Sequence, residues 1–94
     1  METGKIKSLA ADGELVLFAR PGCVHCEQLQ FALELLKNRP DGLPKGGYRY
    51  VNIDDEPTAR ALYDELVPVL CLGERVICAG VFNIENLETD LRDL

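Results

Sequence analysis

The 94-residue sequence has no tryptophan, a single histidine and no apolar run long enough to cross a membrane. Basic residues are also scarce, because ten Lys and Arg stand against sixteen Asp and Glu, for a formal net charge of −6. The Lys and Arg are scattered along the chain, which argues against binding to nucleic acid or to anionic lipid. Internal repeats, low-complexity tracts and linkers are absent, so we expect a single domain.

Residues 1–13 are polar and lack the apolar core and small-residue cleavage site of a secretory signal. We therefore expect a loosely ordered lead-in at residues 1–13, one domain at residues 14–94, and a cytoplasmic protein. In that compartment, four cysteines are expected to serve catalysis, metal binding or core packing rather than a disulfide framework.

The hydrophobic pattern predicts seven elements in the order β-α-β-α-β-β-α. Residues 14–19 are a nearly continuous apolar run, which is typical of a strand buried on both faces. Helices between consecutive strands imply parallel pairing of the first two strands, and two β-rich runs around Gly73 and Glu74 predict an antiparallel hairpin. We expect an α/β fold with a four-stranded mixed sheet flanked by helices. The other predicted strands are residues 48–54, 69–72 and 75–78.

Helical periodicity predicts which face of each helix is buried. The first helix is expected at residues 23–38, Asp54 or Asp55 should cap the second with Pro57 in its first turn, and Asn83 should cap the last. The apolar positions expected to face the core are Leu29, Ala32, Leu33 and Leu36, then Ala59, Leu62, Tyr63 and Leu66, then Ile84, Leu87, Leu91 and Leu94.

A Cys-Val-His-Cys motif at residues 23–26 lies where the first strand gives way to the first helix, directly after Arg-Pro-Gly. Residues three apart share one side of a helix, so Cys23 and Cys26 are within disulfide reach. At the helix N-terminus, Cys23 faces unpaired backbone N–H groups and the positive end of the helix dipole, which stabilise a thiolate. The motif predicts thiol–disulfide exchange, with Cys23 as nucleophile and Cys26, one turn deeper, as resolving cysteine.

Two structural alternatives are open for this motif, a pair of inert core cysteines or half of a zinc site. A zinc site needs a second close pair of ligands, whereas six residues separate Cys71 from Cys78 in the predicted hairpin. With a two-residue turn, Cys71 would face Val76 and Cys78 would face Val69, which leaves the two thiols too far apart for easy bridging. We predict that both pack as small apolar side chains and that no metal is bound.

Two neighbours of the motif are candidates for tuning the thiolate. His25 is able to donate a hydrogen bond, or a positive charge when protonated, to the Cys23 thiolate, which would raise the reduction potential. The alternative interpretation is that His25 is an exposed helix residue that points into water. Arg20 would add positive potential near Cys23, and its alternative is an ordinary surface arginine beside a loop.

The segment LVLFARPGCVHC resembles the active-site strand and turn of the glutaredoxin-like branch of the thioredoxin superfamily. Val67-Pro68-Val69, followed by a hairpin that ends near Gly80, resembles the second landmark of that family. The resemblance covers about residues 14–94 and is nearer to small, uncharacterised bacterial glutaredoxin-like domains than to glutaredoxin itself. It implies a thioredoxin-like fold, a cis Val67–Pro68 bond beside the active-site cysteines, and substrate binding at Val67 and Pro68.

The sequence also departs from the pattern of that family. It lacks the thioredoxin tryptophan, Val24 replaces the proline common between glutaredoxin cysteines, and CAGVFN at residues 78–83 stands where glutaredoxins hold glutathione. The resemblance implies a monomeric protein-disulfide reductase without a cofactor, which acts on a disulfide-containing protein or small thiol and is served by a reductase or thiol donor. The alternatives are a thioredoxin-fold binding module with little turnover and an iron–sulfur carrier.

Overall fold

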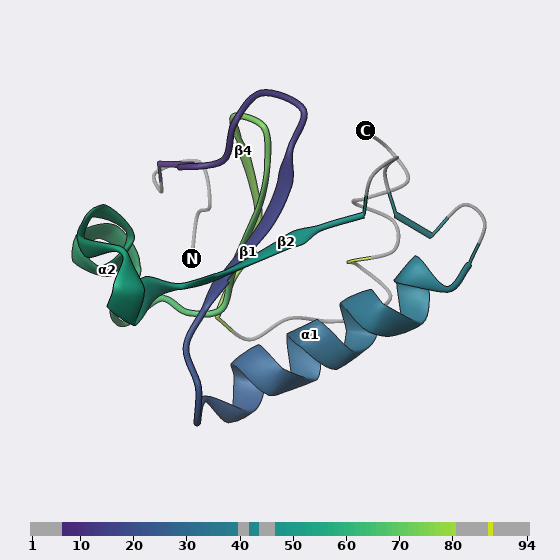
Figure 1. The fold of residues 1–94 in the computed structure, drawn as a ribbon, viewed down its shortest axis with the longest axis horizontal. Helices are drawn as coiled ribbons and strands as arrows, with labels where there is room; N and C mark the ends of the chain where they lie inside the picture. The colour runs from purple at the N-terminus through teal and green to yellow at the C-terminus, as the bar shows by residue number, and fades with distance from the viewer. Residues whose placement is uncertain (1–6, 40–41, 44–46, 81–86, 88–94) are drawn as a thin grey trace.

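The computed structural model of the chain describes residues 7–39, 42–43, 47–80 and 87. These residues form four strands, two α-helices and one short 3-10 helix (Figure 1). In this part of the chain, no helix has the length and apolar character needed to cross a bilayer. The elements are β1 (Leu15–Ala19), α1 (Val24–Lys37), β2 (Arg49–Asn52), η2 (Ile53–Asp55), α2 (Pro57–Tyr63), β3 (Val69–Leu72) and β4 (Arg75–Ala79).

The strands form one mixed sheet in the order β2-β1-β3-β4. β1 pairs in parallel with β2 and antiparallel with β3, while β3 and β4 form an antiparallel hairpin. The predicted α/β architecture, with parallel first strands and an antiparallel hairpin, is confirmed. All five residues of β1 are buried, as expected for a strand covered on both faces of the sheet.

Two apolar clusters lie on opposite faces of this sheet. Because alternate strand residues point to opposite faces, Leu17 packs in the cluster under α1 and Phe18 packs in the cluster that includes α2. Figure 1 shows α1 running along the sheet and α2 at one end of it. Leu87 is buried in the α1 cluster, and the other residues of the predicted final helix lie outside the described residues.

α1 begins at Val24, has Cys23 as its N-cap and ends at Lys37, one residue inside each predicted boundary. Its buried side chains are the four predicted ones together with Cys26, and they repeat at helical spacing. Since this face packs on the β1 side chains, α1 holds the cysteine motif just beyond the carboxyl end of β1.

The chain after β2 differs from the prediction. β2 ends at Asn52, and the next three residues form η2 instead of continuing the strand. The Asn52 side chain accepts a hydrogen bond from the Asp54 N–H at 3.0 Å, so a local cap replaces strand pairing. Asp54 and Asp55 therefore do not cap α2. Glu56 is its N-cap, without a side-chain hydrogen bond, and Pro57 lies in the first turn as predicted.

α2 is shorter than its apolar pattern predicts, because it ends at Tyr63. Ala59 and Tyr63 are buried as expected, but Leu62 is 39% exposed. Leu66 lies beyond the helix and packs against the α2 cluster from the following turn. A helix of seven residues makes about two turns, so few of its residues face the sheet.

The β3–β4 hairpin contains a bulge that changes the predicted register. Cys71 pairs with Val76 as predicted, but Cys78 pairs with Leu70 instead of Val69, because the register shifts between Leu70 and Cys71. A bulge adds one residue to one strand and so interrupts the alternation of faces. Cys71 consequently packs in the α2 cluster and Cys78 against the α1 cluster, on opposite faces of the sheet.

The described part of the N-terminal lead-in is bonded to distant parts of the chain. Ser8 Oγ donates to the Gly73 carbonyl oxygen at 2.6 Å, and the Leu9 N–H donates to the Tyr63 hydroxyl at 3.1 Å. The Tyr63 hydroxyl in turn donates to the carbonyl oxygen of Lys7. The predicted boundary between lead-in and domain stays a prediction.

Candidate active site

Cys23 lies where the chain turns from the sheet into α1. Gly22 before it has a φ of +81°, a left-handed conformation that suits glycine at this turn. Cys23 is the N-cap of α1, and its Sγ accepts a hydrogen bond from the Cys26 N–H at 3.2 Å. A sulfur at this position faces the positive end of the helix dipole. The side chain is half-buried, so a substrate is able to reach it.

Cys26 lies one turn deeper and is only 2% exposed. Burial, reinforced by a hydrogen bond with Cys23, raises the pKa of the Cys26 thiol to about 12, while the backbone and charge of Arg20 act in the opposite direction. At neutral pH Cys26 is therefore a protonated thiol. Both cysteines are unbridged, and the structure brings the predicted pair together with different environments for the two sulfurs.

The Arg20 guanidinium is bound by two carboxylates. Its Nη2 lies 2.9 Å from Asp54 Oδ1 and 2.7 Å from Asp64 Oδ1, and its Nη1 donates to the Asp64 carbonyl oxygen at 3.3 Å. These contacts, the hydrogen bond with Asp64 first, raise the pKa of Arg20. Arg20 thus connects the loop before the cysteine motif to the segment that precedes Val67. Its tuning of the Cys23 thiolate stays a prediction.

His25 lies in the first turn of α1, between the two cysteines, and its side chain is exposed. This placement leaves the imidazole accessible to solvent and to an approaching substrate. A role for His25 in tuning Cys23 stays a prediction.

The Val67–Pro68 peptide bond is cis, as the resemblance implies. Pro68 is fully buried, and its carbonyl oxygen accepts a hydrogen bond from the Gly80 N–H at 2.8 Å. Val67 packs against both apolar clusters, and on the α1 side it shares its cluster with Cys23. Substrate binding by Val67 and Pro68 stays a prediction.

Tyr50 is a neighbour of the cysteines that sequence reasoning missed. The parallel register pairs it with Leu17 and so places it on the α1 face of the sheet. Burial raises the pKa of the Tyr50 hydroxyl, and the charges of Cys26, Cys23 and Glu27 act in the same direction. The hydroxyl is therefore within electrostatic range of both sulfurs. Alternation alone could not find it, because the face that a strand residue takes depends on the register.

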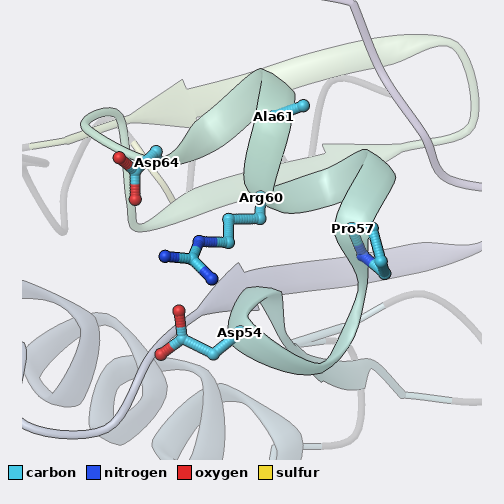
Figure 2. A pocket seen from close by; sticks show the side chains of 5 residues that line it. All are labelled: Asp54, Pro57, Arg60, Ala61 and Asp64. Carbon is cyan, nitrogen blue, oxygen red and sulfur yellow. The ribbon is translucent and has the colours of Figure 1, made fainter.

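A surface cavity of about 440 Å³ lies beside the aspartates that bind Arg20. Figure 2 shows the Arg60 side chain reaching between the Asp54 and Asp64 carboxylates. None of the predicted site residues lines this cavity, so it adds no group to the cysteine site. Its lining residues are Asp54, Pro57, Arg60, Ala61 and Asp64.

Across the described ranges, no group of three or more His, Cys, Asp or Glu side chains is arranged to hold a metal ion. Cys71 packs on the α2 face of the sheet, whereas Cys26 packs on the α1 face. The Tyr63 hydroxyl lies 3.9 Å from Cys71 Sγ. Cys71 therefore cannot join the motif cysteines around one metal ion.

Comparison with known protein families matches most of the chain to one family. Residues 14–92 match the family described as Glutaredoxin-like domain (DUF836). The solved structure of protein XcR50 from X. campestris is 27% identical, with a TM-score of 0.68 over 85% of this chain and 97% of that chain. None of the curated proteins matches the chain.

A second solved structure, protein Ne2328 from Nitrosomonas europaea, is 23% identical, with a TM-score of 0.63 over 89% of this chain and 96% of that chain. This likeness shows the fold alone. The mixed sheet and two helices form an α/β thioredoxin-like fold, and the matched residues include both the cysteine pair at the start of α1 and the cis Val67–Pro68 bond. The chain therefore belongs to the glutaredoxin-like domain family (DUF836).

Proposed function

We propose that the chain is a thiol–disulfide oxidoreductase that reduces disulfides through Cys23 and Cys26. The observation that carries this proposal is the difference between the two sulfurs. Cys23 is half-buried at a helix N-terminus with a backbone N–H bonded to its sulfur, whereas Cys26 is buried and has a raised pKa. A nucleophile has to be accessible and ionised, and a resolving thiol has to lie close behind it.

The proposed reaction begins when the Cys23 thiolate attacks one sulfur of a substrate disulfide. The substrate S–S bond breaks, Cys23 forms a mixed disulfide with that sulfur, and the other sulfur leaves as a thiolate that takes up a proton. Cys26 then loses its proton and attacks Cys23 Sγ, which releases the second substrate thiol and forms the Cys23–Cys26 disulfide. Two electrons pass from the protein to the substrate, and an external thiol donor restores the dithiol.

The order of the two attacks follows from the groups around Cys26. In the free dithiol, the hydrogen bond and the charge of Cys23 help to raise the pKa of Cys26. In the mixed disulfide Cys23 is neutral and has no thiol proton, so both of these contributions disappear. The Arg20 backbone and charge, which lower the pKa of Cys26, are still present. Formation of the mixed disulfide thus favours ionisation of the resolving thiol.

The charges around the site favour a reductant other than glutathione, which is a net anion. Arg20, three residues before Cys23, is already bound to Asp54 and Asp64, and the chain has a formal net charge of −6. Of the segment at residues 78–83 that replaces the glutathione-holding one, residues 81–83 lie outside the described residues. We propose a dithiol protein as the electron donor.

The test is turnover of a disulfide-linked, fluorescently labelled protein with two donor systems, NADPH with thioredoxin reductase and thioredoxin, and NADPH with glutathione reductase and glutathione. Wild type should turn over faster with the first system, and Cys23→Ser should be inactive. Cys26→Ser should accumulate one mixed disulfide per chain. Rapid saturable turnover with glutathione would contradict the donor assignment, and wild-type turnover equal to Cys23→Ser would indicate a binding module instead.

A further inference from the structure

An apolar stripe runs along the outward side of α1. It consists of Val24, Phe31 and Leu35, which are 62%, 67% and 49% exposed. Spacings of seven and four residues bring these side chains onto one line of the helix. The buried residues of α1 lie on the opposite side, against the sheet. α1 therefore has two apolar faces, and the second one faces solvent.

The apolar stripe begins at the cysteine site. Val24 lies between the two cysteines of the motif, and Tyr50, which is 38% exposed, lies on the same face of the sheet as α1. Phe31 and Leu35 are one helical turn apart, and Val24 lies two turns before Phe31 on the same line, with the polar Glu27 and Gln28 at the turn between them. Single exposed apolar residues are common on protein surfaces, whereas several on one line of a helix indicate an interaction site. Whatever binds the stripe therefore lies beside the sulfur that attacks the substrate.

The length of the stripe indicates the size of its occupant. Val24 and Leu35 are eleven positions apart, which corresponds to about 16 Å along the helix axis. A small thiol or disulfide bound at Cys23 would reach only the end of this surface. A protein segment of three or four turns would cover all of it.

The charges beside the stripe indicate the chemistry of that segment. At the positions next to Phe31 on the helix surface, the ionisable residues are Glu27 and Glu34, both exposed. The Tyr48 hydroxyl donates to Glu34 Oε2 at 2.5 Å, which holds this carboxylate beside β2. An apolar line with carboxylates along one edge complements an apolar segment that carries Lys or Arg. Anionic lipid, or a second copy of the same face, would bring like charges together.

We propose that the apolar stripe of α1 docks a basic, apolar-faced segment of a protein whose disulfide is attacked by Cys23. This proposal rests on the proposed oxidoreductase function, because the stripe selects the protein partner for that reaction. Docking on the stripe places the disulfide of the partner at the start of α1.

Binding alone is measured first, with two labelled synthetic helical peptides that contain no cysteine. One has a Leu and Lys pattern and the other has the same Leu positions with Glu. Fluorescence anisotropy should show that wild type binds the Lys peptide at least about tenfold more tightly than the Glu peptide. Phe31→Gln with Leu35→Gln should weaken binding of the Lys peptide by about tenfold or more. Leu62→Gln, a matched change of an exposed leucine on α2, should leave it unchanged.

Turnover separates docking from chemistry. A Lys peptide with one cysteine, disulfide-linked to thionitrobenzoate, should react more slowly with the double variant. Dithiobis(nitrobenzoate), which is too small to cover the stripe, should react equally with both proteins. The glutamine substitutions keep good helix formers in α1, so the far-ultraviolet circular dichroism should not change.

Equal binding of the two peptides by wild type would overturn the proposed docking surface, even if both disulfides are reduced. A wild-type dimer that the double variant converts to a monomer in sedimentation would also overturn it, in favour of a second copy as occupant. Specific peptide binding with no reduction of either disulfide would instead exclude the oxidoreductase function and, with it, a docking role in catalysis.

Discussion

At the scale of single residues, the two cysteines should respond differently to pH. Because burial raises the pKa of Cys26 to about 12, its thiol should stay protonated well above the usual value of 9.0. Cys23→Ser removes the hydrogen bond and the charge of Cys23 but keeps the burial of Cys26, which is the largest cause of the raised pKa. We therefore predict that Cys26 in this variant is alkylated slowly by iodoacetamide, with a rate that rises in the alkaline range. Cys26→Ser, which keeps Cys23, should react at least about tenfold faster at neutral pH. Mass spectrometry of the modified peptides measures each rate.

Cys71→Ser is the matched control for these profiles, because Cys71 is buried on the other face of the sheet. Added to either single variant, Cys71→Ser should leave the alkylation rate of the remaining motif cysteine unchanged. Equal alkylation of Cys23→Ser and Cys26→Ser at neutral pH would contradict the assignment of nucleophile and resolving cysteine.

His25 should influence the reduction potential of the cysteine pair. An imidazole that favours the Cys23 thiolate stabilises the reduced form and makes the protein more oxidising than thioredoxin, whose potential is about −270 mV. We predict that His25→Ala lowers the potential by roughly 10–40 mV, since 30 mV corresponds to about 1.4 kcal/mol. Redox equilibration against a glutathione buffer measures the reduction potential. Substitution of another exposed residue of α1, Gln28→Ala, is the control. Equal potentials for wild type and His25→Ala would exclude this role.

The residues that sequence could predict are those fixed by local spacing. Cys23 and Cys26 are three positions apart at a strand-to-helix turn, so their proximity needs no knowledge of the rest of the fold. Tyr50 and the partner of Cys78 depend on strand register and on a bulge, and neither is encoded in a short stretch of sequence. The ion pairs of Arg20 with Asp54 and Asp64 join segments that are distant in sequence, so they too depend on the three-dimensional fold.

At the scale of elements, Arg20 joins three segments around the cysteine motif. The guanidinium follows β1, and its carboxylate partners are Asp54 in η2 and Asp64 after α2. The positive charge of Arg20 and the negative charges of the two aspartates partly cancel. Their combined effect on the pKa of a nearby thiol therefore depends on which partner is removed. The ion pairs are exposed, so their influence should fall as salt screens them.

We predict opposite effects for the two sides of this ion-pair group, measured in the Cys26→Ser background. Arg20→Ala should slow alkylation of Cys23 at neutral pH, because the loss of one positive charge leaves the Asp54 and Asp64 carboxylates less compensated, and their negative charge opposes the thiolate. Asp54→Asn with Asp64→Asn should accelerate it. Both effects should shrink at about 1 M salt, where the Debye length is about 3 Å.

The matched control for Arg20 is Arg49, whose Nε lies 3.0 Å from Glu14 Oε2. Arg49→Ala removes an exposed ion pair of the same kind and should leave the alkylation rate of Cys23 unchanged. Rates that move in the same direction for Arg20→Ala and the double Asn variant would indicate a structural role instead of an electrostatic one.

The elements themselves were predictable where one hydrophobic period dominates. β1 is a continuous apolar run, and α1 repeats its apolar residues every three or four positions, so both were located to within one residue. η2 was missed because the Asn52 side chain offers Asp54 N–H a local bond that competes with strand pairing. The apolar pattern of α2 continued past its end, because Leu66 reaches the core from a turn.

At the scale of the whole molecule, the Tyr63 hydroxyl connects the lead-in to the core. It accepts from Leu9 N–H, donates to the Lys7 carbonyl oxygen, and lies near Cys71 Sγ. The Tyr63 ring packs on Phe18, with the ring centroids 5.0 Å apart. A single buried hydroxyl therefore links the lead-in, α2 and β3, and its loss should affect the stability of the entire fold.

The stability of the folded protein should fall in the alkaline range. Burial raises the pKa of Cys26, Tyr48, Tyr50 and Tyr63. In the unfolded chain the thiol ionises near 9.0 and the phenols near 10.0, so the unfolded state loses these protons first as pH rises. The stability they contribute is complete below 9.0 and is lost progressively above it.

We predict that Tyr63→Phe separates the two contributions of this hydroxyl. At neutral pH the variant should lose about 1–3 kcal/mol of unfolding free energy, because two partly buried hydrogen bonds, to the backbone of Lys7 and of Leu9, are lost. Above pH 10 its stability should fall less steeply than that of wild type, since one raised phenol pKa is gone. Urea denaturation from neutral pH to above pH 10 measures both changes in unfolding free energy. Tyr48→Phe, which removes the hydroxyl of a more exposed tyrosine, is the comparison. A wild-type stability that does not fall above pH 10, or an equally steep fall in Tyr63→Phe, would contradict this linkage.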